Sequence, residues 1–95
     1  MSFHRHFEMS ISRVEFFRLL PSAVGPFELD GDSDTVRGAV GGGRWTIRLI
    51  ALPHGRLGRI DVPRHRVEIT VEECAEPEGE SFVERFRRGF LRGGG

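Results

Sequence analysis

The chain has 95 residues, of which 38% are hydrophobic and 29% charged; this is the composition of one globular domain and excludes a disordered or membrane-embedded chain. Its 14 basic and 14 acidic residues cancel, so net charge gives no reason to expect nucleic acid or a membrane as a partner. With Cys74 as the single cysteine, no internal disulfide can form.

The beginning of the chain gives no targeting signal. Met1 to His6 lacks the apolar stretch and cleavage site of a signal peptide, and no window approaches the roughly 20 apolar residues that cross a bilayer. We therefore expect a cytoplasmic protein. Lys, Asn, Gln and Tyr are absent, which is typical of a high-GC bacterium and, for Asn and Gln, also of a thermophile.

The first third of the chain predicts a strand followed by a helix. Residues 3–9 alternate apolar and polar side chains, as a strand with one buried face does. Ser12 and Glu15 match the capping-box pattern, so a helix should begin there. Pro21, Gly25 and Pro26 limit its length. Its apolar stripe comprises Phe16, Phe17, Leu20, Ala23 and Val24.

The middle of the chain predicts an antiparallel meander. Turn-forming residues at 30–34 and 41–43 flank a short strand at 35–40. Three strands should follow at 45–52, 57–62 and 65–73, separated by turns at Pro53-His54-Gly55 and Pro63-Arg64. Short connections of this kind join neighbouring antiparallel strands.

The last third predicts a second helix. Ser81 and Glu84 repeat the capping box, and Gly89 would let the helix approach the sheet closely. We expect an α+β fold with one domain over residues 1–92: a curved antiparallel sheet of about five strands with both helices, one after the first strand and one at the C-terminus, on one face. Residues 93–95 should form a flexible glycine tail. The order of elements resembles, in topology alone, the helix-grip arrangement of small ligand-binding domains.

Charge is segregated along the sequence. Residues 37–66 carry seven arginines against Asp61 alone, and residues 68–84 carry seven glutamates and no basic residue. The alternation predicts a basic sheet face opposite the core, which could receive a protein partner or a small anionic ligand: Arg44, Arg48, Arg59 and Arg66. The alternative is pairing of these arginines with Glu68 and Glu72 across strands. Because no aromatic side chain shares this face, we do not expect it to bind nucleic acid.

Two histidines and a carboxylate alternate in the first predicted strand. His4, His6 and Glu8 share one strand face and are residue types that bind transition metals. The alternative is the polar face of an exposed strand. No second ligand cluster with a defined spacing supports the metal hypothesis.

The last five residues, Leu91-Arg92-Gly93-Gly94-Gly95, resemble the Leu-Arg-Gly-Gly tail of ubiquitin. A terminal diglycine is shared by the small sulfur-carrier proteins, whose terminal carboxylate is adenylated and thiolated. The resemblance implies that Gly95 is the activated terminus. The third glycine and the helix directly before the tail depart from those families, as does the strand-helix opening, since those families begin with a hairpin.

We find no nucleophile elbow, Cys-His signature or phosphate-binding loop, so we expect neither an enzyme nor a cofactor. The expected function is a non-catalytic binding or accessory domain that presents its arginine face, or the groove between sheet and last helix, to a protein or small anionic ligand. Two alternatives stay open, a carrier acting through Gly95 and a metal-dependent enzyme using His4, His6 and Glu8. Eight phenylalanines and an unpaired edge strand favour a homodimer.

Overall fold

The fold has two layers, in which helices pack on one face of a sheet. The apolar residues of both layers face each other, as their spacing in the sequence predicts. The computed structural model describes residues 2–30 and 34–94, so Gly31, Asp32 and Ser33 of the expected turn at 30–34 lie outside the described residues. The elements are β1 (Ser2–Met9), α1 (Arg13–Val24), β2 (Glu28–Leu29), β3 (Thr35–Val40), β4 (Gly43–Leu57), β5 (Ile60–Glu72) and α2 (Glu76–Gly94).

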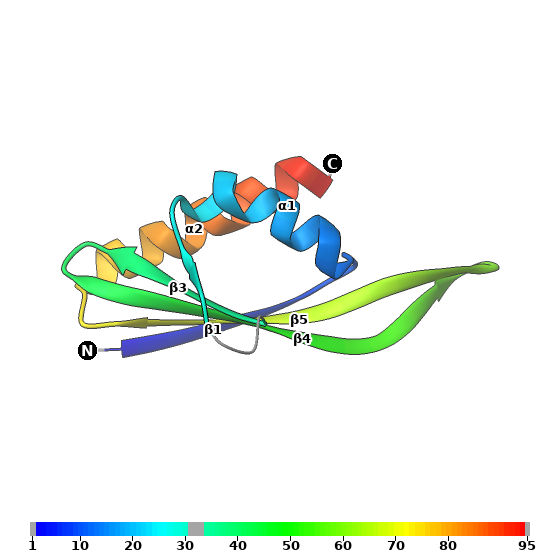
Figure 1. Ribbon diagram of the computed structural model, residues 1–95, viewed down its shortest axis with the longest axis horizontal. Coiled ribbons are helices and arrows are strands. Elements are labelled where there is room, and N and C mark those ends of the chain that lie inside the picture. The colour runs from blue at the N-terminus through cyan, green and yellow to red at the C-terminus, as the bar shows by residue number, and fades with distance from the viewer. Residues whose placement is uncertain (1, 31–33, 95) are drawn as a thin grey trace.

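Within the described residues the strands form one five-stranded sheet in the order β1-β5-β4-β3-β2, and each neighbouring pair is antiparallel. After β1 the chain crosses the sheet as α1 and returns at the opposite edge. Both helices cover the same face, as Figure 1 shows. The predicted α+β class, with a curved antiparallel sheet and both helices on one face, is therefore confirmed.

The core lies between the helices and the odd-numbered residues of the central strands. Trp45 is 1% exposed, and its ring stacks on Phe82 of α2 with centroids 5.2 Å apart. Phe16 of α1 and Phe90 of α2 stack at 5.1 Å. The buried core comprises Phe16, Leu20, Ala23, Val24, Val36, Trp45, Ile47, Leu49, Val67, Ile69, Val71, Phe82, Val83, Phe86 and Phe90.

Helix α1 begins where the capping pattern predicts. The Glu15 backbone N–H donates to Ser12 Oγ at 3.1 Å, which satisfies one of the free amides of the first turn. The Glu15 carboxylate does not complete the capping box but accepts from Arg18 Nε at 3.0 Å. This hydrogen bond to Arg18 holds the pKa of Glu15 below its usual value. The helix continues through Pro21 and ends at Gly25, whose φ is 79°.

The predicted turns at Pro53-His54-Gly55 and Pro63-Arg64 are wrong. β4 and β5 instead form one long hairpin. A β-bulge between Leu52 and Gly55 accommodates one extra residue of β4. Among the described residues, β3 pairs with β4 only up to Arg48, and β1 pairs with β5 only from His65 onward. The hairpin end between these two residues therefore has no third strand beside it. A proline is tolerated there because its missing N–H would have faced solvent rather than another strand.

Helix α2 also differs from the prediction. It begins at Glu76 rather than near Ser81 and extends to Gly94, two residues beyond the expected end of the domain at Arg92. Gly89 approaches α1 rather than the sheet, because a Cβ there would lie 2.7 Å from the Cβ of Ala23. In the part of the chain that the structure describes, no helix is both long and apolar enough to cross a membrane.

Candidate functional site

The arginine face is only partly assembled as predicted. Arg44, Arg48 and Arg66 occupy even-numbered positions of β4 and β5 on the sheet face that the helices leave open, whereas Arg59 lies in the β4–β5 turn, away from them. Arg44 Nε lies 3.4 Å from Glu72 Oε1, and Arg66 Nε lies 3.3 Å from Glu68 Oε2. The Arg44–Glu72 pair joins β4 to β5, as the cross-strand alternative predicted, whereas Arg66 pairs with Glu68 along its own strand.

His4, His6 and Glu8 also lie along the open face, but they are not arranged around one point. His4 Nδ1 is 3.1 Å from Thr70 Oγ1, and Glu8 accepts from Arg64 Nη2 at 2.7 Å. Among the described residues, no three His, Cys, Asp or Glu side chains are placed to hold a metal ion. The geometry therefore gives the metal hypothesis no support.

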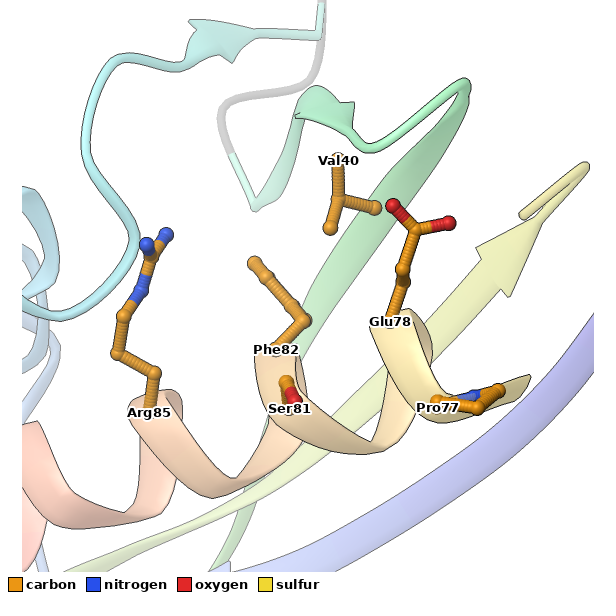
Figure 2. Close-up of a pocket in the computed structure, with 6 residues that line it drawn as sticks. All are labelled: Val40, Pro77, Glu78, Ser81, Phe82 and Arg85. Atoms are coloured by element: carbon orange, nitrogen blue, oxygen red, sulfur yellow. The ribbon is translucent and has the colours of Figure 1, made fainter. Parts of the chain in front are cut away.

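A groove runs between α2 and the end of β3, with a cavity volume of about 380 Å³. Figure 2 shows Phe82 in its middle, Val40 across from it, and the charged groups of Glu78 and Arg85 at its two ends. From Glu78 to Arg85, the helix residues of the lining are spaced at i, i+3, i+4 and i+7, which places these four on one helix face. The lining residues are Val40, Pro77, Glu78, Ser81, Phe82 and Arg85.

Packing fixes both ends of the groove. Arg85 Nη2 donates to the carbonyl oxygen of Val24 at 3.2 Å, which satisfies a free carbonyl at the end of α1 and uses one of the five guanidinium N–H donors. The Glu78 carboxylate lies over the β3–β4 turn, since a Cβ on Gly41 would be 2.5 Å from Glu78 Oε2. Gly41 has a φ of 55°, a conformation that glycine adopts without strain.

The groove combines an apolar floor with charged ends. Its lining includes no histidine, no cysteine and only one carboxylate, so it contains neither a nucleophile with a base nor a pair of acids. Phe82 is 3% exposed and supplies an apolar floor, while Glu78 and Arg85 are exposed. An apolar floor with a few placed polar groups is the usual chemistry of a binding pocket.

The sequence located this groove only in general terms, as the space between sheet and last helix. Its individual residues were missed because the helix was expected to begin near Ser81. Pro77 just inside the start and the acidic Glu76 and Glu78 in the first turn were the signals that could have found the true start.

Comparison with protein-family models matches residues 9–95 to the archaeal MoaD-like protein family. The chain belongs to this family. The match includes α1, the sheet from β2 to β5, and all of α2. No curated protein and no solved structure shows significant similarity to the chain.

The family match includes the C-terminal glycines and agrees with the observed fold class. The small α+β fold is that of a sulfur-carrier-type family, and it matches in part the carrier alternative drawn from the last five residues. The structure nevertheless opens with a strand and a helix, where ubiquitin and the sulfur carriers begin with a hairpin. Gly93 and Gly94 belong to α2, and Gly95 lies outside the described residues.

Proposed function

We propose that this MoaD-like protein is a non-catalytic binding domain whose groove receives a short extended segment of a protein partner. The observation that carries the proposal is the pairing of an apolar floor, Phe82 and Val40, with one carboxylate and one guanidinium at opposite ends. The expected arginine face is a weaker candidate because its charges are largely paired.

The spacing of the charged groups favours a peptide. Arg85 follows Glu78 by seven positions along the helix, or about 10 Å at 1.5 Å per residue. About three extended residues span that length. An acidic side chain or a terminal carboxylate would pair with Arg85, an amino or amide group would donate to Glu78, and an apolar side chain would cover Phe82.

A titration with short peptides tests the groove. We expect tripeptides that combine a free carboxylate with a central apolar residue to shift the backbone amide NMR signals of Glu78, Ser81 and Arg85. Arg85→Ala should weaken binding roughly ten- to a hundredfold, because a charge-assisted hydrogen bond of about 1.5–3 kcal/mol is lost. Arg88→Ala removes the same charge from an exposed position near Glu84 and serves as the matched control. Shifts confined to other surfaces, or equal effects of both variants, would exclude the groove.

A second candidate is favoured by the family match together with the tail Leu91-Arg92-Gly93-Gly94-Gly95. In this proposal the protein is a sulfur carrier, and the carboxylate of Gly95 is adenylated and then converted to a thiocarboxylate. An activating enzyme would need the last residues extended in its active site, so Gly93 and Gly94 would have to leave the helix.

Intact-mass analysis of untagged protein from its own host separates the two candidates. A carrier should show a fraction whose mass reports replacement of one carboxylate oxygen by sulfur, and deletion of residues 93–95 should abolish it. The same deletion should leave peptide binding in the groove unchanged. An unmodified C-terminal residue under conditions of sulfur demand would contradict the carrier proposal and leave the groove untouched.

A further inference from the structure

A second pocket lies between the end of β1, the loop that follows it and the second half of α2. Its cavity volume is about 290 Å³, and it shares no lining residue with the groove beside β3. Apolar side chains from all three segments form most of its wall. These are Phe7, Met9, Ile11 and Phe90.

The wall of this pocket is held in place by contacts with the core. Phe86 is 0% exposed, and the centroid of its ring lies 6.2 Å from that of Phe7 and 4.6 Å from that of Phe90. The loop is fixed by His65 of β5, whose Nδ1 lies 2.7 Å from the carbonyl oxygen of Ile11. A ligand would therefore meet a pocket that is largely formed before binding.

Arg87 supplies a positive charge at the exposed side of the pocket. The central carbon of its guanidinium lies 5.7 Å from the ring centroid of Phe7, a cation–π contact that keeps the side chain over the apolar wall. Within the part of the chain that the structure describes, Arg87 makes neither an ion pair nor a hydrogen bond. Glu84, one turn earlier on α2, lies instead beside Arg88, with their charged atoms 4.0 Å apart. The N–H donors of Arg87 are therefore available to a ligand.

The carboxylate of Glu8, which also lines the pocket, does not offset this charge. Glu8 is an even-numbered residue of β1, so its side chain lies on the open face of the sheet, whereas α2 covers the other face. Its Oε1 accepts a hydrogen bond from Arg64 Nη2 at 2.7 Å. The pocket thus combines an apolar wall with one unpaired guanidinium, a group that binds carboxylates in a bidentate manner.

We propose that this pocket binds a small monocarboxylate with an apolar body. The carboxylate pairs with Arg87, and the body lies against Met9, Ile11 and Phe90. A water molecule takes up about 30 Å³ in the liquid, so a cavity of this volume holds a ligand of about ten non-hydrogen atoms. The unbranched, flexible side chain of Met9 adapts to the shape of that body. Octanoate has the matching size and chemistry and is the probe that we would use.

The monocarboxylate pocket is independent of the peptide groove. Arg85 and Arg87 are two positions apart on α2, a spacing that places side chains on different faces of a helix. Arg85 donates to the carbonyl oxygen of Val24, whereas Arg87 lies over Phe7. Each arginine therefore serves one site, and the failure of either proposal leaves the other untouched.

A titration of the full-length protein with octanoate, followed by NMR, tests the proposal. We expect shifts of the backbone amide signals of Ser10 and Ile11 and of the side-chain Nε–H signal of Arg87, with a dissociation constant on the order of 0.1–1 mM. The amide signal of Ser81 in the groove should not move. Acetate has the head group without the body, and octylammonium has the body with the opposite charge, so neither should produce the shifts.

Two neighbouring arginines provide matched variants. Arg87→Gln should weaken octanoate binding about tenfold or more, because charge-assisted hydrogen bonds are lost. Arg88→Gln removes the same charge beside Glu84 and should bind octanoate like wild type. Arg87→Glu should lose octanoate and bind octylammonium instead. Both positions are exposed, so circular dichroism should show an intact fold in every variant.

Three results would each overturn the proposal. The first is a titration in which octanoate leaves the signals of the pocket unmoved. The second is binding of acetate or octylammonium to the wild type as tight as that of octanoate, which would show that either the apolar body or the charge contributes nothing. The third is an equal loss of octanoate binding in Arg88→Gln and Arg87→Gln, which would show a general effect of charge on α2.

Discussion

At the residue scale, close packing leaves no space for a side chain at one position of β3. Gly38 of β3 faces the indole of Trp45, and a Cβ at this position would lie 2.4 Å from Trp45 Cζ2. That ring is buried and stacked on Phe82, so it has little space to move. The sequence shows a glycine within a predicted strand, but only the packed structure shows what the glycine accommodates.

We expect Gly38→Ala to lower the free energy of unfolding by about 1–3 kcal/mol, the usual cost of overpacking a core. Urea denaturation followed by circular dichroism measures it. Gly42→Ala is the control, because a Cβ there would meet nothing within 4 Å, and it should be close to neutral. Equal midpoints for both variants would show that Trp45 moves aside freely.

At the scale of elements, the capping-box pattern occurs in both helical segments, but its serine caps a helix only in the first. Ser12 caps α1, whereas Ser81 lies inside α2 because that helix begins at Glu76. The turn of α2 that precedes Ser81 is stabilised by packing, since Gly79 is buried against the ring of Phe3 on β1. A capping box therefore marks the start of a helix only where packing does not extend the helix toward its N-terminus.

Ser12→Ala should therefore lower the free energy of unfolding by about 1 kcal/mol, the usual value of an N-cap hydrogen bond. Ser81→Ala, at an exposed position inside a helix, should cost nothing or stabilise slightly because alanine favours the helix. Thermal and urea denaturation of the two variants provide the comparison. A loss of stability in Ser81→Ala equal to that in Ser12→Ala would contradict the different roles assigned to the two serines.

At the scale of the whole molecule, the end of the β4–β5 hairpin, residues 52–64, gives the fold its elongated shape of 47 × 28 × 21 Å. The body is a layer of helices on a sheet, with its apolar side chains between them. The hairpin end has no such layer, so Leu57 and Ile60 at its tip remain exposed.

The alternation of polar and apolar residues predicted some positions of the candidate site residues but not others. Alternation placed Arg44, Arg48 and Arg66 on the open sheet face correctly, because a strand's period of two is local. The pattern places Arg59 wrongly, because Pro53 and Pro63 on either side of it are typical of turns, whereas here they lie in strands without an outer neighbour. Glu78 and Arg85 were not recognised as groove residues, because the approach of α2 to the end of β3 depends on contacts distant in sequence.

The sequence by itself determined the α+β class, the antiparallel central strands, the start of α1 at Ser12 and the apolar faces that form the core. Each of these follows from local periodicity or from a cap within a few residues. Only the tertiary structure decided the strand order, the long β4–β5 hairpin, the early start of α2 and the groove beside it. The strand order, the start of α2 and the groove depend on which distant surfaces bury each other, because packing that buries more apolar surface overrides local cap signals. The hairpin continues through Pro53 and Pro63 because no third strand needs their missing backbone donors.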